Sequence, residues 1–314
     1  MITTSFFSYK GGSCRSTTTM NTAYFLAKQT EGPTEEEATA EKPIVLVDMD
    51  VDSAGLTILF ETHNIKDKLT VQGLIGTPEN ELNALFRSNY KGELSGHPFF
   101  SQLIPVGKFL GLKDNRAALL LPADISNNGK FTVSEKEAQI FTTMKSVCRQ
   151  CGCKALIFDT PAGAQVNANI SLSNSDIIVC CMRPTYQFRA GTTRFLCESF
   201  ENGKEFNYIL CPTAVSKQEV ILPGGTVMPD KLAELFVSDV INPISNVKVG
   251  NETGLEHIDE RMIRGNDNGI LGIPEVALFK WKEACLSNLD ELSDDEKEAL
   301  ECYKYLAHLI KEDA

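Results

Sequence analysis

Short runs of apolar residues recur along the chain, and stretches with helical spacing separate them. The runs fall at residues 2–7, 44–47, 155–158, 176–182 and 206–211. A continuous apolar run of this length is typical of a strand that is buried on both faces of a parallel sheet. Between the runs, apolar positions repeat with a helical period, as in residues 20–27 and 133–150. This alternation predicts an α/β fold with a doubly wound, mostly parallel sheet and helices on both of its faces.

Two stretches do not follow this alternation. Residues 30–43 are rich in glutamate and almost without apolar residues, so we expect a solvated acidic loop there. Residues 57–134 are interpreted as an elaborated connection within the domain, although a small packing lobe without a site fits them equally well. The pattern within this connection predicts short helices at 69–75 and 79–86 and strands at 99–104 and 117–121.

The last quarter of the chain contains two more predicted helices. Residues 231–240 have helical spacing, and a stretch rich in Gly and Asn follows them. Ser293 and Glu296 have the spacing of a capping box, so we expect a final amphipathic helix over 293–312 that packs on the body. We find no internal repeat, and residues 1–314 are predicted to form a single domain.

Gly11 and Gly12 lie between the first predicted strand and the first predicted helix. Backbone N–H groups and a helix N-terminus favour an anion at such a point, and a phosphate is the natural occupant. Glycines let the backbone approach the ligand, Arg15 adds cationic donors, and the Ser16 hydroxyl suits a hard magnesium ion. A tight turn without a ligand is the alternative for a glycine pair taken alone.

Acidic residues follow two of the predicted buried strands. Asp48 and Asp50 come after the strand at 44–47, and Asp159 comes after the strand at 155–158. An acidic group at the end of a buried strand is costly unless it is paired or faces a ligand. Ligands of such sheets bind at the carboxyl ends of the strands, so these residues are candidates for managing magnesium and water.

The stretch from Lys10 to Thr17, which reads KGGSCRST, resembles the deviant Walker A loop of the ParA/MinD-like ATPases. In that loop a signature lysine precedes two glycines. The wider stretch from Phe6 is similar to a subgroup with the motif KGGVGR, in which Arg replaces the usual Lys. Cys14 departs from this motif, because its Cβ stands where glycine lets the loop close around the phosphates. The resemblance implies a P-loop NTPase fold of the SIMIBI class.

Two further motifs extend the resemblance. Residues 48–56, DMDVDSAGL, resemble the DxDLEAPGL segment of the same subgroup, with Asp52 in place of Glu and Ala54 where Pro is usual. Residues 159–163, DTPAG, resemble the Walker B and switch II pattern DxPxG. The resemblance implies that Asp50 positions the attacking water, that Asp48 lies near the metal, and that Asp159 holds Mg²⁺ through a water molecule. It is specific over residues 1–60 and 154–215 and only topological elsewhere.

The resemblance also implies ATP and Mg²⁺ as cofactors and a homodimer that encloses the nucleotide. Lys10 would reach the nucleotide of the second subunit, and Arg15 would bridge two phosphate oxygens. The implied catalytic residues are Lys10, Arg15 and Asp50, and the implied metal residues are Ser16, Asp48 and Asp159. The implied nucleotide-binding residues are Lys10, Gly11, Gly12, Ser13, Cys14, Arg15, Ser16, Thr17, Pro212 and Pro274.

The identity of the base is less well supported than the phosphate site. Pro212 and Pro274 would border the base, but both prolines could equally do no more than end strands. The segment after the strand at 206–211 also lacks the Asn-Arg pair that is common among relatives. Adenine specificity therefore rests on the resemblance of the loop.

Composition limits the classes of binding partner and indicates the cellular compartment that we expect. A net charge of −12 argues against broad attraction to nucleic acid or anionic lipid, and residues 183, 189 and 194 are arginines that are interpreted first as a solvated face. DNA binding by these arginines stays an alternative. No signal peptide or long apolar run is visible, so we expect a cytoplasmic protein without a membrane anchor.

The ten cysteines are expected to be free thiols. Cys148, Cys151 and Cys153 have a spacing that leaves metal binding as a minor alternative. Two functions from different classes fit the whole sequence. The first is a slow switch ATPase that dimerises around ATP to control a partner, with a DNA-partitioning ATPase as a variant. The second is a nucleotide-binding scaffold with little hydrolysis, which the presence of Cys14 in the loop motivates.

Overall fold

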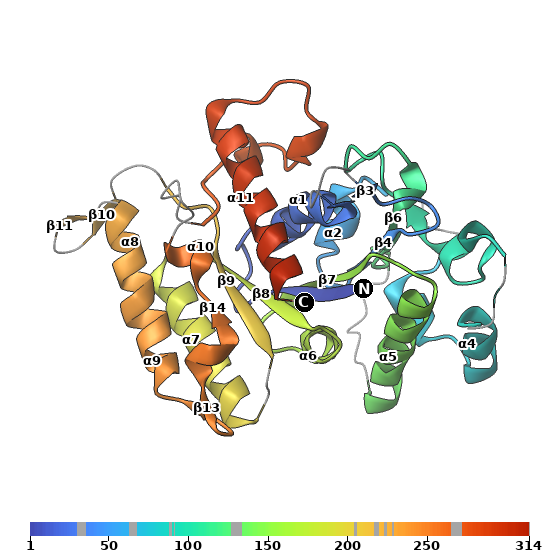
Figure 1. The fold of residues 1–314 in the computed structure, drawn as a ribbon, viewed down its shortest axis with the longest axis horizontal. Coiled ribbons are helices and arrows are strands. Elements are labelled where there is room, and N and C mark those ends of the chain that lie inside the picture. Colours follow the sequence, from blue (N-terminus) through green and yellow to red (C-terminus); the bar gives the residue numbers. More distant parts are fainter. Residues whose placement is uncertain are drawn as a thin grey trace.

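Eight strands form the central sheet of the computed structural model, in the order β14-β9-β8-β1-β7-β4-β6-β5 (Figure 1). All neighbouring strands are parallel except β5 and β6. Their bounds are β1 Ile2–Ser8, β4 Ile44–Asp48, β5 Ile104–Pro105, β6 Ala118–Leu121, β7 Ala155–Ala162, β8 Ile177–Met182, β9 Asn207–Pro212 and β14 Ile258–Asp259. The mostly parallel, doubly wound α/β sheet predicted from the apolar runs is confirmed. The structure describes residues 1–29, 36–62, 68–87, 90, 92–126, 134–203, 206–216, 220–222, 225–227, 229–264 and 272–313.

Helices cover both faces of this sheet (Figure 1). Helices α1, α2 and α11 lie on one side, and α5, α6 and α7 lie on the other. The helices are α1 Arg15–Ala27, α2 Gly55–Leu59, α3 Val71–Ile75, α4 Glu79–Leu85, α5 Glu135–Gln150, α6 Val166–Ser173, α7 Tyr186–Glu201, α8 Pro229–Phe236, α9 Asn242–Ser245, α10 Arg261–Arg264 and α11 Asp294–Glu312. A π-helical turn, Val237–Ile241, joins α8 to α9.

The strand residues alternate between two core layers, which explains why the strands have continuous apolar sequences. Ile44 and Leu46 of β4 pack in the cluster that contains α1 and α11. Val45 and Val47 of the same strand pack in the cluster that contains α5. Successive side chains of a strand point to opposite faces, so a sheet covered on both sides needs apolar residues at every position.

Helices α5 and α11 begin at capping boxes, and the box at Ser293 is the one predicted from the sequence. Ser134 opens α5 with a capping box to Glu137, and Ser293 opens α11 with a capping box to Glu296. Helix α11 packs against α1 with Tyr303 fully buried, so the predicted packing of the final helix on the body is confirmed. None of the helices in the described part of the chain has both the length and the apolar character needed to cross a bilayer.

Several predictions for the irregular stretches need correction. Residues 30–35 lie outside the described residues, but within 36–43 the short strand β3, Glu36–Glu37, pairs with β2, Lys28–Gln29. Ala38 is buried and its N–H donates to the carbonyl of Ala27, so the chain at this residue is tied to the end of α1, whereas Thr39, Glu41 and Lys42 are exposed.

The connection over 57–134 is partly as predicted. Helices α3 and α4 and strand β6 confirm three of its four predicted elements. The strand predicted over 99–104 is instead a 3₁₀ turn, Phe100–Gln102, followed by β5. Phe99 and Phe100 are both fully buried and pack edge to face, and a helical turn directs consecutive aromatic side chains into one core.

The remaining described elements are short. The ribbons are β10 Val220–Leu222 with β11 Gly225–Val227, and β12 Lys248–Val249 with β13 Glu252–Thr253. The other 3₁₀ turns are Leu94–Gly96, Asn115–Ala117, Gly254–His257, Ala277–Lys280 and Leu286–Asn288.

Candidate functional site

The order of the strands brings the predicted residues together. Strand β7 lies between β1 and β4, so its Asp159 is flanked by Phe6 on one side and by Asp48 on the other. The glycine loop follows β1, and Asp50 lies just beyond β4. The sequence predicts that a strand ends before Asp159, whereas β7 continues to Ala162 and carries Asp159 within it. Asp159 is completely buried as a result.

The glycine loop leaves open space where an anion would bind. A Cβ added to Gly11 or to Gly12 would meet no atom within 4 Å, and Gly12 has a φ of +80° that favours glycine. The N-cap of α1 is Cys14, which makes no side-chain capping bond, and the first turn contains no acidic residue. Neither the N-cap nor the first turn therefore supplies a side chain that accepts from the N–H groups at the start of α1, which lie at the positive end of the helix dipole.

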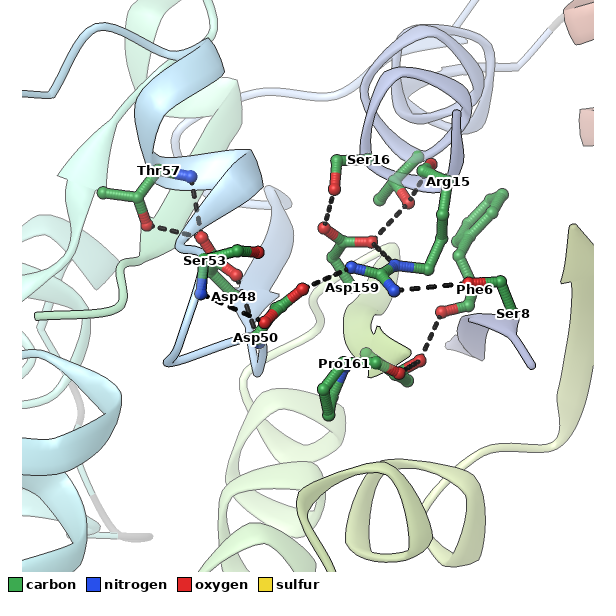
Figure 2. A network of polar contacts seen from close by, with 12 residues as sticks. Phe6, Ser8, Arg15, Ser16, Asp48, Asp50, Ser53, Thr57, Asp159 and Pro161 are labelled. Atoms are coloured by element: carbon green, nitrogen blue, oxygen red, sulfur yellow. Dashed lines mark hydrogen bonds and ion pairs between the residues drawn. The ribbon is translucent and has the colours of Figure 1, made fainter. Parts of the chain in front are cut away.

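Arg15 is the centre of a buried ion network (Figure 2). Its Nε donates to Asp159 Oδ1 at 2.8 Å, and its Nη2 donates to Asp50 Oδ2 at 2.8 Å. The side chain is only 7% exposed. Burial by itself lowers the pKa of Arg15, but the carboxylates of Asp159 and Asp50 outweigh it and raise the pKa above its ordinary value. Arg15 therefore stays charged and holds the two carboxylates on either side of it.

Ser16 completes the inner part of the network. Its Oγ donates to Asp159 Oδ2 at 2.5 Å, while Thr19 donates to the other oxygen at 3.2 Å. A Cβ on Gly55 would lie 2.8 Å from the Ser16 hydroxyl, so glycine is needed where α2 approaches α1. The Ser16 hydroxyl and the Asp159 carboxylate therefore face each other (Figure 2).

Asp48 lies beside Asp159 on the neighbouring strand, and α2 holds its side chain. Its Oδ2 accepts hydrogen bonds from the N–H and the hydroxyl of Thr57, both at 2.7 Å. Its Oδ1 accepts from the N–H of Asp50 at 3.2 Å. Complete burial, together with the nearby charge of Asp159, raises the pKa of Asp48 to about 7 despite the bonds from Thr57.

A cavity of about 210 Å³ opens on the other side of the loop. Thr213 closes one wall by donating to the carbonyl of Ser13 at 2.7 Å. Pro274 lines the cavity, whereas Pro212 is not among its lining residues and instead accepts a hydrogen bond from the N–H of Ile273. Other lining residues are Cys14, Arg183, Phe279, Glu283 and Tyr303. The cavity is thus mainly apolar, with charged groups at a few points.

Cys14 has a left-handed backbone with a φ of 57°, which is uncommon for a residue with a Cβ. Its side chain lines the cavity and accepts a weak hydrogen bond from Arg183 Nη2 at 3.7 Å. Burial raises the pKa of the Cys14 thiol, and Arg183 opposes this only in part. The departure from glycine at this position therefore affects the cavity as well as the loop.

The segment 276–289 is tied to α1 beside this cavity. Thr17 Oγ1 donates to Glu283 at 2.8 Å, and Asn21 bonds to the backbone of Ala284 and Leu286. The same segment carries Trp281, the single tryptophan of the chain, whose side chain is 92% exposed.

Lys10 lies at the outer edge of the loop. Its Nζ donates to Gln187 Oε1 of helix α7 at 2.5 Å, and the side chain is exposed. Among the described residues, Lys10 shares no hydrogen bond or ion pair with Arg15 or Asp50, which pair with each other. Lys10 is thus not part of the network that joins the other two residues predicted to be catalytic.

Sequence reasoning missed several contributors to the site. Thr57 and Gln187 carry no motif of their own, and Glu283 lies in a stretch without periodic pattern. Arg183 belongs to the arginines predicted to form a solvated face, but it lines the cavity. The other two are neutralised by neighbours, with Arg189 paired to Asp239 and Arg194 paired to Glu198, so these residues do not favour DNA binding.

The alternative metal site at the cysteines receives no support from the described residues. Cys148 and Cys153 are buried free thiols, and Cys151 is partly buried. Across the described ranges, no group of three or more His, Cys, Asp or Glu side chains is arranged to hold a metal ion.

Comparison with known proteins identifies the fold. No family model and no curated protein matches the chain. MinD from Pyrococcus horikoshii, solved with Mg-ADP, aligns over 100% of this chain and 98% of its own at 14% identity, with a TM-score of 0.54. A putative plasmid partition protein from Borrelia burgdorferi bound to AMPPNP aligns over 99% and 98% at 16% identity, with a TM-score of 0.56. A Cyanothece McdA–ATP complex aligns over 97% and 95% at 14% identity, with a TM-score of 0.54. The chain therefore has the MinD/ParA P-loop NTPase fold.

Proposed function

We propose that this chain is a magnesium-dependent, ATP-binding switch protein that hydrolyses ATP slowly and dimerises around the nucleotide to control a protein partner. The observation that carries the proposal is the convergence of an open glycine loop, the Ser16–Asp159 pair and Asp50 at the carboxyl edge of adjacent strands. This edge is where parallel α/β sheets bind ligands. The Mg-ADP, AMPPNP and ATP bound by proteins of the same fold support the choice of nucleotide.

The donor set fits magnesium. Ser16 and Asp159 would hold the ion, with Asp48 behind them, and all three offer the oxygen donors that Mg²⁺ prefers. Magnesium commonly takes few protein ligands and completes its shell with water and phosphate oxygens, which agrees with the small number of groups here. When bound, the ion would neutralise charge on the phosphate oxygens.

The side chains of the chain would act by position and charge. The N–H groups at the start of α1 bind the phosphates, and Asp50 orients a water molecule for attack. Arg15 must exchange Asp50 and Asp159 for phosphate oxygens before it can bridge the nucleotide. Its planar guanidinium can make this exchange while keeping two hydrogen bonds at once. Lys10 serves the nucleotide of a second subunit, and Pro274 borders the base.

Light scattering with ATP, with ADP and without nucleotide tests the switch. We expect a larger dimer fraction with ATP than in the other two samples. Equal monomer fractions in all three would remove the nucleotide-enclosing dimer from the proposal.

Phosphate release tests the hydrolysis. Asp50→Asn should reduce the rate to background while nucleotide affinity is kept or improved, because Arg15 is then held by one carboxylate instead of two. Asp52→Asn is the matched control, since Asp52 is exposed and lies two residues away in the same loop.

A nucleotide-binding scaffold with little hydrolysis is the second candidate. The strained Cys14 and the engagement of Asp50 by Arg15 favour it. Wild type and Asp50→Asn would then show the same background rate, with nucleotide binding retained in both.

A further inference from the structure

One face of helix α7 receives side chains from the strand and loop that precede the glycines. Gln187, Gly191 and Phe195 are spaced four residues apart, so they lie on one face of the helix. Their contacts, in the same order, are Lys10, Tyr9 and Phe7. Three of the residues just before the glycines, Phe7, Tyr9 and Lys10, therefore contact this face of α7.

The contact between Tyr9 and Gly191 requires glycine. A Cβ at Gly191 would lie 2.1 Å from Cδ1 of the Tyr9 ring and 2.8 Å from its Cγ. These atoms belong to the rigid part of the ring close to the backbone, so the ring could not yield without moving the chain at Tyr9. Because Lys10 is the next residue, such a movement would displace it.

The helix is held firmly enough to act as a support. Phe195 stacks on Phe7 with ring centroids 4.2 Å apart. Arg189, on the same helix, pairs with Asp239 of the π-helical turn at 2.9 Å and is 6% exposed. A side chain held by a packed helix is placed more precisely than one held by a loop.

We propose that α7 is the positioning element for Lys10, with Gln187 holding the ammonium group and Gly191 admitting the Tyr9 ring. The proposal rests on the proposed function, since it gives Lys10 a purpose as a phosphate ligand. Gln187 and Gly191 are positioning residues, because they act through Lys10 and Tyr9 and not on the nucleotide itself. Without α7, the exposed Lys10 would keep its charge but lose its fixed place.

The first test needs no nucleotide. In Gln187→Ala, the rate at which an amine-reactive reagent labels Lys10, measured by mass spectrometry against other lysines, should rise about two- to tenfold, as expected for the loss of one hydrogen-bond partner. Gln139→Ala on helix α5 is the matched control and should leave the rate unchanged. Unchanged labelling in Gln187→Ala would overturn the part assigned to Gln187.

The second test examines the contact between Tyr9 and Gly191. Gly191→Ala should lower the Tm in the wild-type chain but raise it in the Tyr9→Ala background, because alanine favours a helix once the ring is absent. Equal changes of Tm in the two backgrounds would contradict the proposal that Gly191 admits the Tyr9 ring.

The third test connects the helix to nucleotide binding. The loss of affinity for a labelled ATP analogue in Gln187→Ala should vanish in the Lys10→Ala background, because a residue that acts through Lys10 has no further effect without it. The same loss in both backgrounds would overturn the proposal. If Lys10→Ala leaves affinity and hydrolysis intact, the function proposed for Lys10 fails, while labelling and unfolding still decide whether α7 positions it.

Discussion

The two ends of the site are built in different ways. At the phosphate end, Arg15, Asp50, Asp159 and Ser16 hold one another by charge and hydrogen bonds within 3 Å. At the base end, which is the cavity where we propose that the base binds, the lining is mainly apolar, and the hydrogen bond from Thr17 to Glu283 joins the segment 276–289 to helix α1. The residues that we propose bind phosphate are therefore the same ones that stabilise this part of the fold by ion pairing. Substitutions at the first end should therefore change both the free energy of unfolding and the nucleotide affinity strongly, and substitutions at the second end should change both by smaller amounts.

Loss of Arg15 should have the largest effect. Arg15→Ala leaves Asp159 buried without its partner, and removal of one member of a buried pair costs about 3–5 kcal/mol in the free energy of unfolding. Arg15→Lys keeps the charge but cannot hold both carboxylates or bridge two phosphate oxygens. Its affinity for ATP should fall about tenfold to a hundredfold, and that of Arg15→Ala should fall further.

Chemical unfolding and titration with a labelled ATP analogue measure the two effects on the same samples. Arg261→Ala is a suitable control, because this arginine also pairs with carboxylates but lies near the C-terminal end of α11. Unchanged affinity in a folded Arg15→Ala chain would show that the loop does not hold phosphate through this residue.

The raised pKa of Asp48 predicts a pH dependence of stability. The native chain keeps a proton on Asp48 up to about pH 7, whereas the unfolded chain releases it near the ordinary value of 3.8. The native state binds more protons in this window, so the free energy of unfolding falls as the pH rises through it. We expect a loss on the order of 2–4 kcal/mol from this group between pH 4 and pH 8.

Urea unfolding at several pH values, with EDTA and without nucleotide, measures this loss. Asp48→Asn should remove most of it, because an amide does not titrate. Asp52→Asn, at an exposed position, should keep the wild-type dependence. Parallel curves for wild type and Asp48→Asn would contradict the assignment.

Cys14→Gly should increase the nucleotide affinity and relieve backbone strain beside the cavity. Glycine relieves the left-handed backbone, worth about 1–2 kcal/mol, and this is offset in part by about 0.5–1 kcal/mol of added freedom in the unfolded chain. The substitution also enlarges the cavity beside the loop, so nucleotide affinity should rise several-fold. Cys14→Ala keeps the Cβ and separates its effect from that of the sulfur. An equal gain in the two variants would mean that the sulfur, and not the backbone, limits binding.

Thr17→Val should have the smallest effect. It removes the hydrogen bond to Glu283 but keeps the shape of the side chain, so the free energy of unfolding should fall by about 1 kcal/mol or less. Affinity should weaken about threefold, because the cavity wall loses one link to α1. Thr22→Val is the matched control, since the Thr22 hydroxyl is buried without a hydrogen-bond partner among the described residues. Isothermal titration and unfolding of both variants would show whether the link matters.

The sequence predicts the groups of the phosphate end but not how they pair. Apolar runs and strand-end carboxylates are local signals, so Asp48, Asp50 and Asp159 could be assigned to one edge of a sheet. The ion pairs of Arg15 depend on β7 lying between β1 and β4, and periodicity does not reveal strand order. The prediction that Arg15 bridges phosphates remains a prediction, and the carboxylates are its observed partners in this structure.

The base end is harder to predict for a related reason. Its walls come from turns such as Ala277–Lys280, which are too short to show a helical period. Glu283 and Thr17 are 266 positions apart in the sequence, and no local sequence pattern indicates their contact. Pro274 could be proposed from the resemblance alone, and the structure places it at the cavity without testing its part in binding.

The exposed Trp281 gives the protein a built-in optical reporter. As the single tryptophan, it accounts for the indole emission of the whole chain, and it follows directly after the turn that lines the cavity. Its emission should lie at long wavelength in the free protein, because the ring is surrounded by water. If the segment 276–289 folds over a bound base, the spectrum should shift to shorter wavelength on mixing with ATP. The arrival of nucleotide at the base end could then be timed without any label, separately from events around Arg15.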